Sequence, residues 1–334
     1  MKFSWVLPTC MQGLNHPPGF GGPDELIKIA QTAEKLGLYG LWANDHIAPW
    51  PKLRQAYSKP LSWHEILMST AFCAGVTKKI KLGLGVIVAP FREPVLLAKQ
   101  VATLDVFSGG RVLLGMGLGF PRDEFEILRP RQVKANRARM LEETLEAFRL
   151  INDEADASFN GKYYAFEKLA LYPKPLQKPL PLYLSGEVPN TLERIAKYGA
   201  GLMVIGGPDE ALRKRVDELG AALAKVGRDI SEIDVAISLA VSLDTTHEAA
   251  VKRFLASYVG RRFSSRARTP EDLDKIIKGN LVGTPQEVAE RVEGMAKAGM
   301  THSAPQHIAA ESMSDMMEQM HIYAEELAPL CKSL

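Results

Sequence analysis

Residues 81–119 constrain the fold more than any other stretch, because they predict a strand, a helix and a second strand in direct succession. Lys81–Val88 is a continuous apolar run rich in Val and Ile, which is typical of a parallel strand buried on both faces. Pro94 suits the first position of a helix, and residues 108–110 supply the glycines that end it. Residues 111–116 are apolar again. The stretch therefore predicts one parallel βαβ unit with a right-handed crossover.

Glycines gather near the ends of both predicted strands. Gly83 and Gly85 lie inside the first strand, and Gly115, Gly117 and Gly119 line the exit of the second. Glycine weakens a strand, so it usually marks the close approach of a ligand or of another backbone. Ligands of parallel α/β proteins bind at the carboxyl ends of the strands. These glycines therefore fit either a cofactor site at that edge or the relief of crowding inside a small barrel.

Strand and helix patterns alternate along the rest of the chain. Eight alternations in 334 residues predict an α/β fold of the (β/α)8 TIM-barrel type, rather than a doubly wound open sheet. The barrel would form a single domain over residues 1–334. The other strands are expected at residues 3–7, 41–44, 182–185, 202–205, 235–243 and 301–308, and insertions at the carboxyl-terminal face at residues 45–62, 120–135, 153–181 and 258–282.

Two of the insertions carry signals of their own. An Asn-Gly pair between aromatic runs predicts a β-hairpin at residues 159–166. Residues 258–282 show little apolar periodicity, which predicts a long, mobile connection at the catalytic face. Its cationic groups favour an anionic cofactor tail, so the segment would act as a lid or contact a partner subunit. The arginines concerned are Arg261, Arg262, Arg266 and Arg268.

Composition argues against several other classes of protein. A net charge of +2 gives no reason to expect nucleic acid or an anionic membrane as a partner. No apolar run is long enough to span a bilayer, and the first residues do not form a signal peptide. The three cysteines, Cys10, Cys73 and Cys331, are odd in number and widely spaced. They argue against a disulfide framework or a metal site and favour a cytoplasmic location.

His46 is the candidate catalytic residue, because it follows the second predicted strand and would lie at the mouth of a barrel. A neutral imidazole there can accept or donate a proton. The side chain of Asp45 should point elsewhere, since successive residues of an extended chain face opposite ways. Trp50 could form the wall beside a planar ring. The alternative is a loop histidine that makes a structural hydrogen bond.

Two loops follow the fourth and fifth predicted strands. Bare backbone amides at the start of a helix bind phosphate well, and a serine hydroxyl adds a further donor. The two loops would flank one mouth, which favours a phosphate site over two ordinary strand-to-helix turns. The candidate cofactor-binding residues are Gly117, Leu118, Gly119, Ser185, Gly186, Glu187 and Val188.

The same stretch resembles the luciferase-like monooxygenase superfamily. The matching motifs run from Leu82 to Pro94, from Ala98 to Asp105 and from Ser108 to Arg111, and end in Gly-x-Gly-x-Gly at residues 115–119. Several linked motifs form a specific signal. The resemblance extends over roughly residues 3–300. It implies a TIM-barrel enzyme that uses reduced FMN or the deazaflavin coenzyme F-420.

The resemblance also implies roles for single residues. The Asp-His pair that ends in His46, with Trp50 four residues later, is similar to deazaflavin-dependent dehydrogenases. The Gly85–Val86 bond aligns with a non-proline cis peptide that lies behind the flavin ring. Phe120 replaces the glutamate proton donor of the sugar-phosphate dehydrogenases, which argues against that substrate class. Further cofactor-binding residues implied on this side of the mouth are Asn44, Asp45, Trp50, Gly85 and Val86.

The implied function is F-420-dependent hydride transfer to or from a small organic substrate, because the Gly-x-Gly-x-Gly motif is closer to the deazaflavin branch. A two-component monooxygenase, which takes reduced FMN from a reductase partner and uses O2, is the alternative. A second alternative is a protein that binds a flavin without catalysis. The resemblance also implies a homodimer. Zinc hydrolases and Schiff-base aldolases are disfavoured, because no histidine spacing matches a zinc site and strands five to eight lack lysine.

Overall fold

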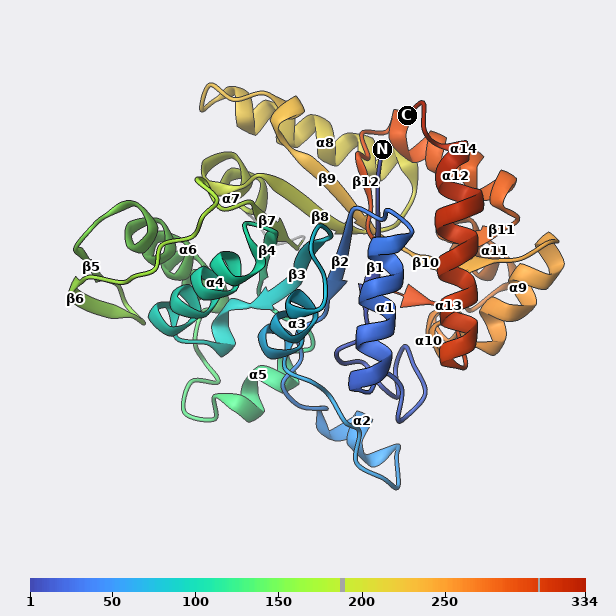
Figure 1. Ribbon diagram of the computed structural model, residues 1–334, viewed down its shortest axis with the longest axis horizontal. Coiled ribbons are helices and arrows are strands. Elements are labelled where there is room, and N and C mark those ends of the chain that lie inside the picture. Colours follow the sequence, from blue (N-terminus) through green and yellow to red (C-terminus); the bar gives the residue numbers. More distant parts are fainter. Residues whose placement is uncertain (187–189, 306) are drawn as a thin grey trace.

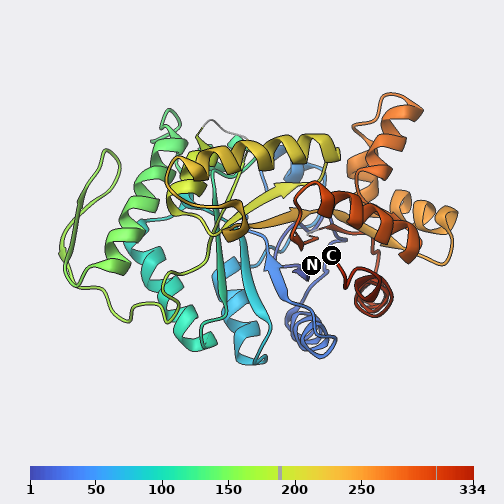
Figure 2. The same cartoon turned by 90° about the horizontal axis from the view of Figure 1, so that it is seen from above.

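The computed structural model describes residues 1–186, 190–305 and 307–334. Its centre is a closed barrel of parallel strands in the order β1-β12-β9-β8-β7-β4-β3-β2 (Figures 1 and 2), which confirms the predicted TIM barrel. The barrel strands are β1 Lys2–Leu7, β2 Gly40–Ala43, β3 Lys81–Val88, β4 Val112–Gly117, β7 Leu182–Ser185, β8 Gly201–Ile205, β9 Asp234–Ser238 and β12 His302–Ser303.

Helices cover the outside of the barrel (Figure 2). No helix in the described part of the chain is long and apolar enough to cross a membrane. The two termini meet at the amino-terminal end of the barrel, where the Met1 ammonium donates to the Leu334 carbonyl. The outer helices are α1 Pro23–Lys35, α3 Ile66–Gly75, α4 Pro94–Ser108, α6 Arg137–Asp153, α7 Thr191–Tyr198, α8 Asp209–Ala224, α12 Pro285–Lys297 and α13 Met313–His321.

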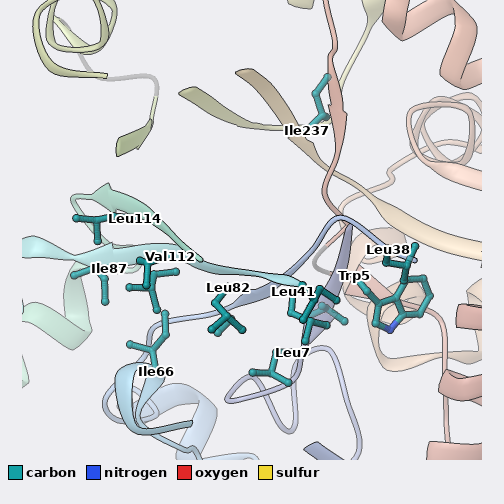
Figure 3. Packing of buried hydrophobic residues seen from close by; sticks show 14 of the residues in the cluster. Trp5, Leu7, Leu38, Leu41, Ile66, Leu82, Ile87, Val112, Leu114 and Ile237 are labelled. Atoms are coloured by element: carbon teal, nitrogen blue, oxygen red, sulfur yellow. The ribbon is translucent and has the colours of Figure 1, made fainter. Parts of the chain in front are cut away.

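The predicted βαβ unit is confirmed by β3, α4 and β4. Helix α4 begins at Pro94, and the side chain of Glu93 accepts a hydrogen bond of 2.9 Å from the Leu96 amide. It ends at Gly109, whose φ of 72° lies in the left-handed region that glycine adopts without strain. Figure 3 shows how Leu82 and Val112 of the two strands pack with Ile66 of α3 in the main core.

Aromatic and apolar side chains fill the inside of the barrel, so the barrel is not a pore. Two glycines make room for the rings. A Cβ atom on Gly83 would lie 2.3 Å from the Trp42 ring, and one on Gly201 would lie 2.2 Å from the Tyr183 ring. Of the two explanations for the strand glycines, relief of crowding inside the barrel is therefore the correct one for Gly83. The buried members of this inner cluster are Trp42, Leu113, Tyr183, Met203, Ala236 and Ala304.

The seventh and eighth predicted strands are each broken in two. Both were expected to be continuous, but the chain leaves the barrel after β9 and after β12. The second halves, β10 and β13, join β11 in a separate parallel sheet in the order β11-β10-β13. Because both halves of each strand are buried, the apolar pattern continues across the break and does not reveal it. The strands of this second sheet are β10 Ala240–Leu243, β11 Leu281–Gly283 and β13 His307–Ile308.

The predicted insertion at residues 258–282 contains two short helices, α10 and α11, which its weak apolar periodicity did not indicate. Side-chain oxygens of Ser257 and Thr269 cap them by accepting from backbone amides. Phe263 and Ile276 pack on the core of the second sheet. Short helices with few buried residues leave little periodicity to detect. The helices of this region are α9 His247–Ala256, α10 Tyr258–Ser264 and α11 Pro270–Lys278.

The other insertions also contain regular elements. The hairpin is confirmed, although its turn spans residues 161–164. Helices α2 and α5 lie at the end of the barrel opposite the termini (Figure 1), within segments expected to be loops. The bounds are α2 Pro51–Gln55, α5 Arg122–Leu128, β5 Ala157–Asn160, β6 Ala165–Leu169, the short helical turns Ala89–Phe91, Ile230–Glu232 and Ile322–Leu327, and α14 Ala328–Leu330.

Candidate active site

The carboxyl ends of four adjacent barrel strands bring several predicted residues together. The Asn44 side-chain amide, after β2, donates a hydrogen bond of 3.5 Å to the Gly85 carbonyl in β3. A Cβ atom on Gly117 of β4 would lie 2.8 Å from Cγ2 of Val86 and 3.9 Å from the Ser185 carbonyl oxygen of β7. These five residues therefore line one side of the mouth, as expected for residues that end parallel strands.

The expected cis peptide bond between Gly85 and Val86 is present. The pairing of β3 with β4 shifts register there, between Leu84 and Ile87. Val86 packs against the inner cluster of the barrel. Residues at this bulge are thus turned toward the barrel axis, where a ligand in the mouth would meet them.

Packing accounts for Gly117 and Gly119 without any ligand. A Cβ atom on Gly119 would lie 2.5 Å from Cγ1 of Val88, and the φ of 76° at this position is strained for other residues. Gly186 differs, because its φ is 118° and no atom of the described residues lies within 4 Å of a built Cβ. Of these glycines, Gly186 is the one at which a Cβ would meet no described atom.

His46 lies at the mouth, directly after β2, with its side chain 13% exposed. Its Nδ1 donates a hydrogen bond of 2.7 Å to Oε2 of Glu124, which fixes the tautomer in which Nε2 carries the lone pair. Two indole rings stand beside the imidazole, that of Trp63 at 5.3 Å and that of Trp50 at 6.0 Å between ring centroids. Trp50 was predicted to lie here, whereas Trp63 was not.

Glu124 is a site residue that the sequence analysis missed. It lies in the first turn of α5 and is 1% exposed. Its Oε1 accepts from the backbone amides of Ile47 and Ala48 at 2.6 Å and 3.2 Å, so the carboxylate holds the whole His46 loop. Phe120, at the position where the resemblance places a glutamate, is 81% exposed. The carboxylate is supplied four residues later, and the acidic first turn of a short helix was the available signal.

Asp45 points away from His46, as predicted. Its carboxylate accepts from the Val88 amide at 2.8 Å and from both terminal nitrogens of Arg92 at 2.5 Å and 2.9 Å. Burial raises the pKa of Asp45 above its ordinary value, while the Arg92 guanidinium opposes that shift. Because the protein already occupies both oxygens, Asp45 joins the β2 loop to the β3 loop.

Two arginines flank the predicted phosphate loops. Arg137 of α6 donates to the carbonyls of Leu118 and Gly119 at 3.3 Å and 3.0 Å. Arg215 of α8 donates to the Gly186 carbonyl, while its buried Nε has no hydrogen-bond partner among the described residues. An unpaired guanidinium nitrogen beside the open space at Gly186 suits an anionic group. The predicted residues Glu187 and Val188 lie outside the described part of the chain.

Neither metal ligands nor a disulfide accompany these groups in the ranges that the structure describes. Those residues contain no group of three or more His, Cys, Asp or Glu side chains placed to hold a metal ion. Cys10, Cys73 and Cys331 are all free and buried. The arrangement at the mouth is therefore one histidine held by a buried carboxylate, with aromatic walls on one side and guanidinium groups on the other.

Sequence comparisons relate this chain to known enzymes. The family model described as luciferase-like monooxygenase matches residues 1–302, which confirms the resemblance. An F420-dependent glucose-6-phosphate dehydrogenase of Amycolatopsis mediterranei is 26% identical over 300 residues, which is 84% of this chain and 87% of the relative. The oxygenase component of a flavin-dependent trigonelline monooxygenase of Acinetobacter baylyi is 25% identical over 307 residues, 83% of this chain and 81% of the relative.

Solved structures show the same fold. A monooxygenase from Streptomyces bottropensis superposes with a TM-score of 0.81 at 23% identity and covers 98% of this chain and 99% of its own. An F420-dependent secondary alcohol dehydrogenase superposes with a TM-score of 0.79 at 21% identity, covering 99% of each chain. The relatives thus include oxidoreductases dependent on F420 and on flavin, the two cofactor classes expected from the sequence.

Proposed function

Because the chain belongs to the luciferase-like monooxygenase family, we propose that it transfers a hydride between coenzyme F-420 and a small organic substrate, with His46 moving the accompanying proton. The observation that carries this proposal is the His46–Glu124 hydrogen bond at the barrel mouth. The pair presents Nε2 as the nitrogen that is free to exchange a proton. The relatives that depend on F420 and align over most of this chain support the choice of cofactor.

The described residues fit a deazaflavin at the mouth. The loops after β4 and β7 would hold its anionic tail, helped by Arg137 and by the unpaired nitrogen of Arg215. Val86 and Ile205 would contact the ring, since Ile205 ends β8 with a side chain that is 77% exposed. Ser238, paired with Ile205 across β8 and β9, has a buried hydroxyl with no partner in the described ranges, and this hydroxyl would hydrogen-bond to the ring.

Each residue around His46 then has a defined task. When bound, F-420 supplies the carbon that gives or takes the hydride. Glu124 accepts from Nδ1, so that Nε2 is the atom that takes the proton from a substrate hydroxyl or returns it to a carbonyl. A buried carboxylate stabilises the imidazolium that results. Trp50 and Trp63 limit the access of water to the ring.

A two-component monooxygenase is the second candidate. The trigonelline monooxygenase component is almost as similar as the F420-dependent relatives, at 25% identity against 26%. In that case a separate reductase would deliver reduced FMN, and the same loops would hold its single phosphate. A cytoplasmic location is proposed for either function, because the three buried cysteines remain free thiols.

The exposed faces of α3 and α4 support the proposal of a homodimer. Met68 and Phe72 on α3, and Leu96 and Phe107 on α4, are large apolar side chains exposed to solvent, and the Phe107 side chain is 80% exposed. The two helices pack side by side, so the four exposed residues lie on neighbouring elements. Exposed apolar surface of this kind marks interfaces between proteins.

Paired variants of His46 and Glu124 test the proposed mechanism. With a substrate identified by F-420 turnover, His46→Ala should lower kcat by about 100-fold, because the proton-transfer group is gone. Glu124→Gln keeps the size of the side chain but loses its charge, so kcat should fall by about tenfold with little change in KM. Steady-state assays that follow F-420 absorbance would measure kcat and KM of both variants. The affinity of each variant for F-420 should stay unchanged. Near wild-type kcat in His46→Ala would show that His46 is not the proton carrier.

A further inference from the structure

The mouth has a second polar group on the side formed by β1 and β12. Asn15, in the loop after β1, lies between His307 and Arg262. Its side-chain amide donates to Nδ1 of His307 at 2.7 Å, and its Oδ1 accepts from Arg262 at 2.6 Å. His307 begins β13, and Arg262 belongs to α10. Three separate segments thus bring a guanidinium group above the carboxyl ends of β1 and β12.

Arg262 has no counterion among the described residues. It donates a hydrogen bond to the neutral Asn15 amide, and no carboxylate in the described part of the chain lies within ion-pair distance. Burial and the nearby positive charge of Arg266 lower the pKa of Arg262 to about 10, so the group still carries its charge at neutral pH. Two neighbouring arginines are paired with carboxylates, Arg261 with Glu311 and Arg253 with Asp244. A half-buried, unpaired guanidinium is costly unless an anion binds it.

The position of Arg262 separates it from the loops proposed to hold the cofactor tail. In the closed ring of strands, β1 lies opposite β7, whereas β2, which leads to His46, is its neighbour. The His46 segment also reaches the loop after β1 directly, because the Tyr57 hydroxyl donates to the Gly13 carbonyl at 2.5 Å. Arg262 therefore lies on the His46 side of the mouth and across the barrel from Ser185 and Gly186.

We propose that Arg262, held by Asn15, binds an anionic group of the substrate, such as a carboxylate, phosphate or sulfonate. This inference rests on the proposed function, since it assumes that the reacting carbon lies beside His46. A planar guanidinium can bind two oxygens of such a group at once. Arg266 adds positive potential, and the ring of Phe263, 5.5 Å from that of His307, covers the side of the subsite.

Titration with inorganic phosphate tests the subsite independently of activity. Isothermal titration calorimetry would compare the wild-type chain with Arg262→Gln, and with Arg268→Gln as a control of equal charge change in the same segment. Phosphate affinity should fall by about tenfold or more in Arg262→Gln and stay unchanged in the control, as the loss of a charge-assisted pair predicts. Phosphate bound at the loops after β4 and β7 would be common to all variants. Equal affinity in Arg262→Gln and wild type would overturn the proposal.

Asn15→Asp supplies a second variant that removes no arginine. The new carboxylate would lie 2.6 Å from Arg262 and form an ion pair with it, so phosphate affinity should fall as in Arg262→Gln. F-420 affinity, measured on the same samples, should change little in either variant. A loss of F-420 affinity with unchanged phosphate binding would assign Arg262 to the cofactor tail and contradict the proposal. Failure of F-420 to bind even the wild type would reject the proposed cofactor, while the phosphate comparison would still decide on Arg262.

Discussion

Glu124 shows how one buried side chain can prepare a histidine for proton transfer. The amides of Ile47 and Ala48 occupy one of its oxygens, and Nδ1 of His46 occupies the other. The carboxylate cannot turn away from the imidazole without breaking the hydrogen bonds of the loop. Folding has already oriented the carboxylate toward the imidazole, so the two groups need not rearrange when His46 takes up a proton.

His16 should make the stability of the chain depend on pH. Burial lowers the pKa of His16 from its ordinary value of 6.5 to about 4, and no residue that the structure describes hydrogen-bonds to its Nδ1. The folded state requires a neutral imidazole. The contribution of His16 to the free energy of unfolding is therefore complete above pH 6.5 and is lost as the pH falls towards 4. At most about 3 kcal/mol of the free energy of unfolding is involved.

Urea denaturation at a series of pH values would measure this effect. His16→Leu should lose less stability than wild type between pH 6.5 and 4, while His321→Gln, at an exposed position, should behave like wild type. Burial also lowers the pKa of His302, so the slope should shrink in His16→Leu rather than disappear. An unchanged slope in that variant would show that His16 is not the responsible group.

At the scale of elements, the close contact between β3 and the chain after β4 depends on Gly119. Gly119→Ala should lower the free energy of unfolding by about 1–3 kcal/mol, because Cβ would meet Val88 and φ is 76°. Gly110→Ala is a matched control, since its φ of 78° is similar but the nearest atom to its Cβ is 3.4 Å away. Chemical denaturation measures both. If Gly119→Ala is no less stable than Gly110→Ala, crowding by Val88 does not explain the glycine.

The elements that sequence patterns predict well are those with long buried faces. Strand β3, which is buried on both faces, and helix α4, which is buried along one face, follow the expected bounds, because such burial imposes a long apolar pattern. Helices α5 and α10 have seven residues each and bury few side chains, so their patterns are too short to detect. The breaks after β9 and β12 were missed for the opposite reason, since both halves are buried.

The same contrast applies to the site. Residues that end or directly follow a predicted strand, such as Asn44, His46 and Ser185, could be placed at one mouth once the barrel was inferred. Glu124 and Arg262 reach the mouth from helices, through contacts between residues 78 and 247 positions apart in the chain. The pattern of neighbouring residues in the sequence does not indicate contacts between distant residues, so these contacts become visible only in the folded structure.

At the scale of the whole molecule, the apolar surface on α3 and α4 should join two copies of the chain. Phe107→Glu combined with Met68→Glu places charges on that surface and should convert a dimer into a monomer in size-exclusion chromatography with light scattering. Val226→Glu, at an exposed site after α8, should leave the mass unchanged. A wild-type monomer at micromolar concentration, or a dimer that survives the double substitution, would contradict the proposed interface.

A paired equilibrium titration of the purified chain with F-420 and FMN tests the proposed cofactor most directly. Arg137 and Arg215 stand beside the two loops, and F-420 carries a phosphate and a polyglutamate tail, whereas FMN carries only a phosphate. F-420 should therefore bind at least about tenfold more tightly than FMN, and the difference should shrink as salt is added. Tighter binding of FMN, or no binding of F-420, would contradict F-420-dependent hydride transfer.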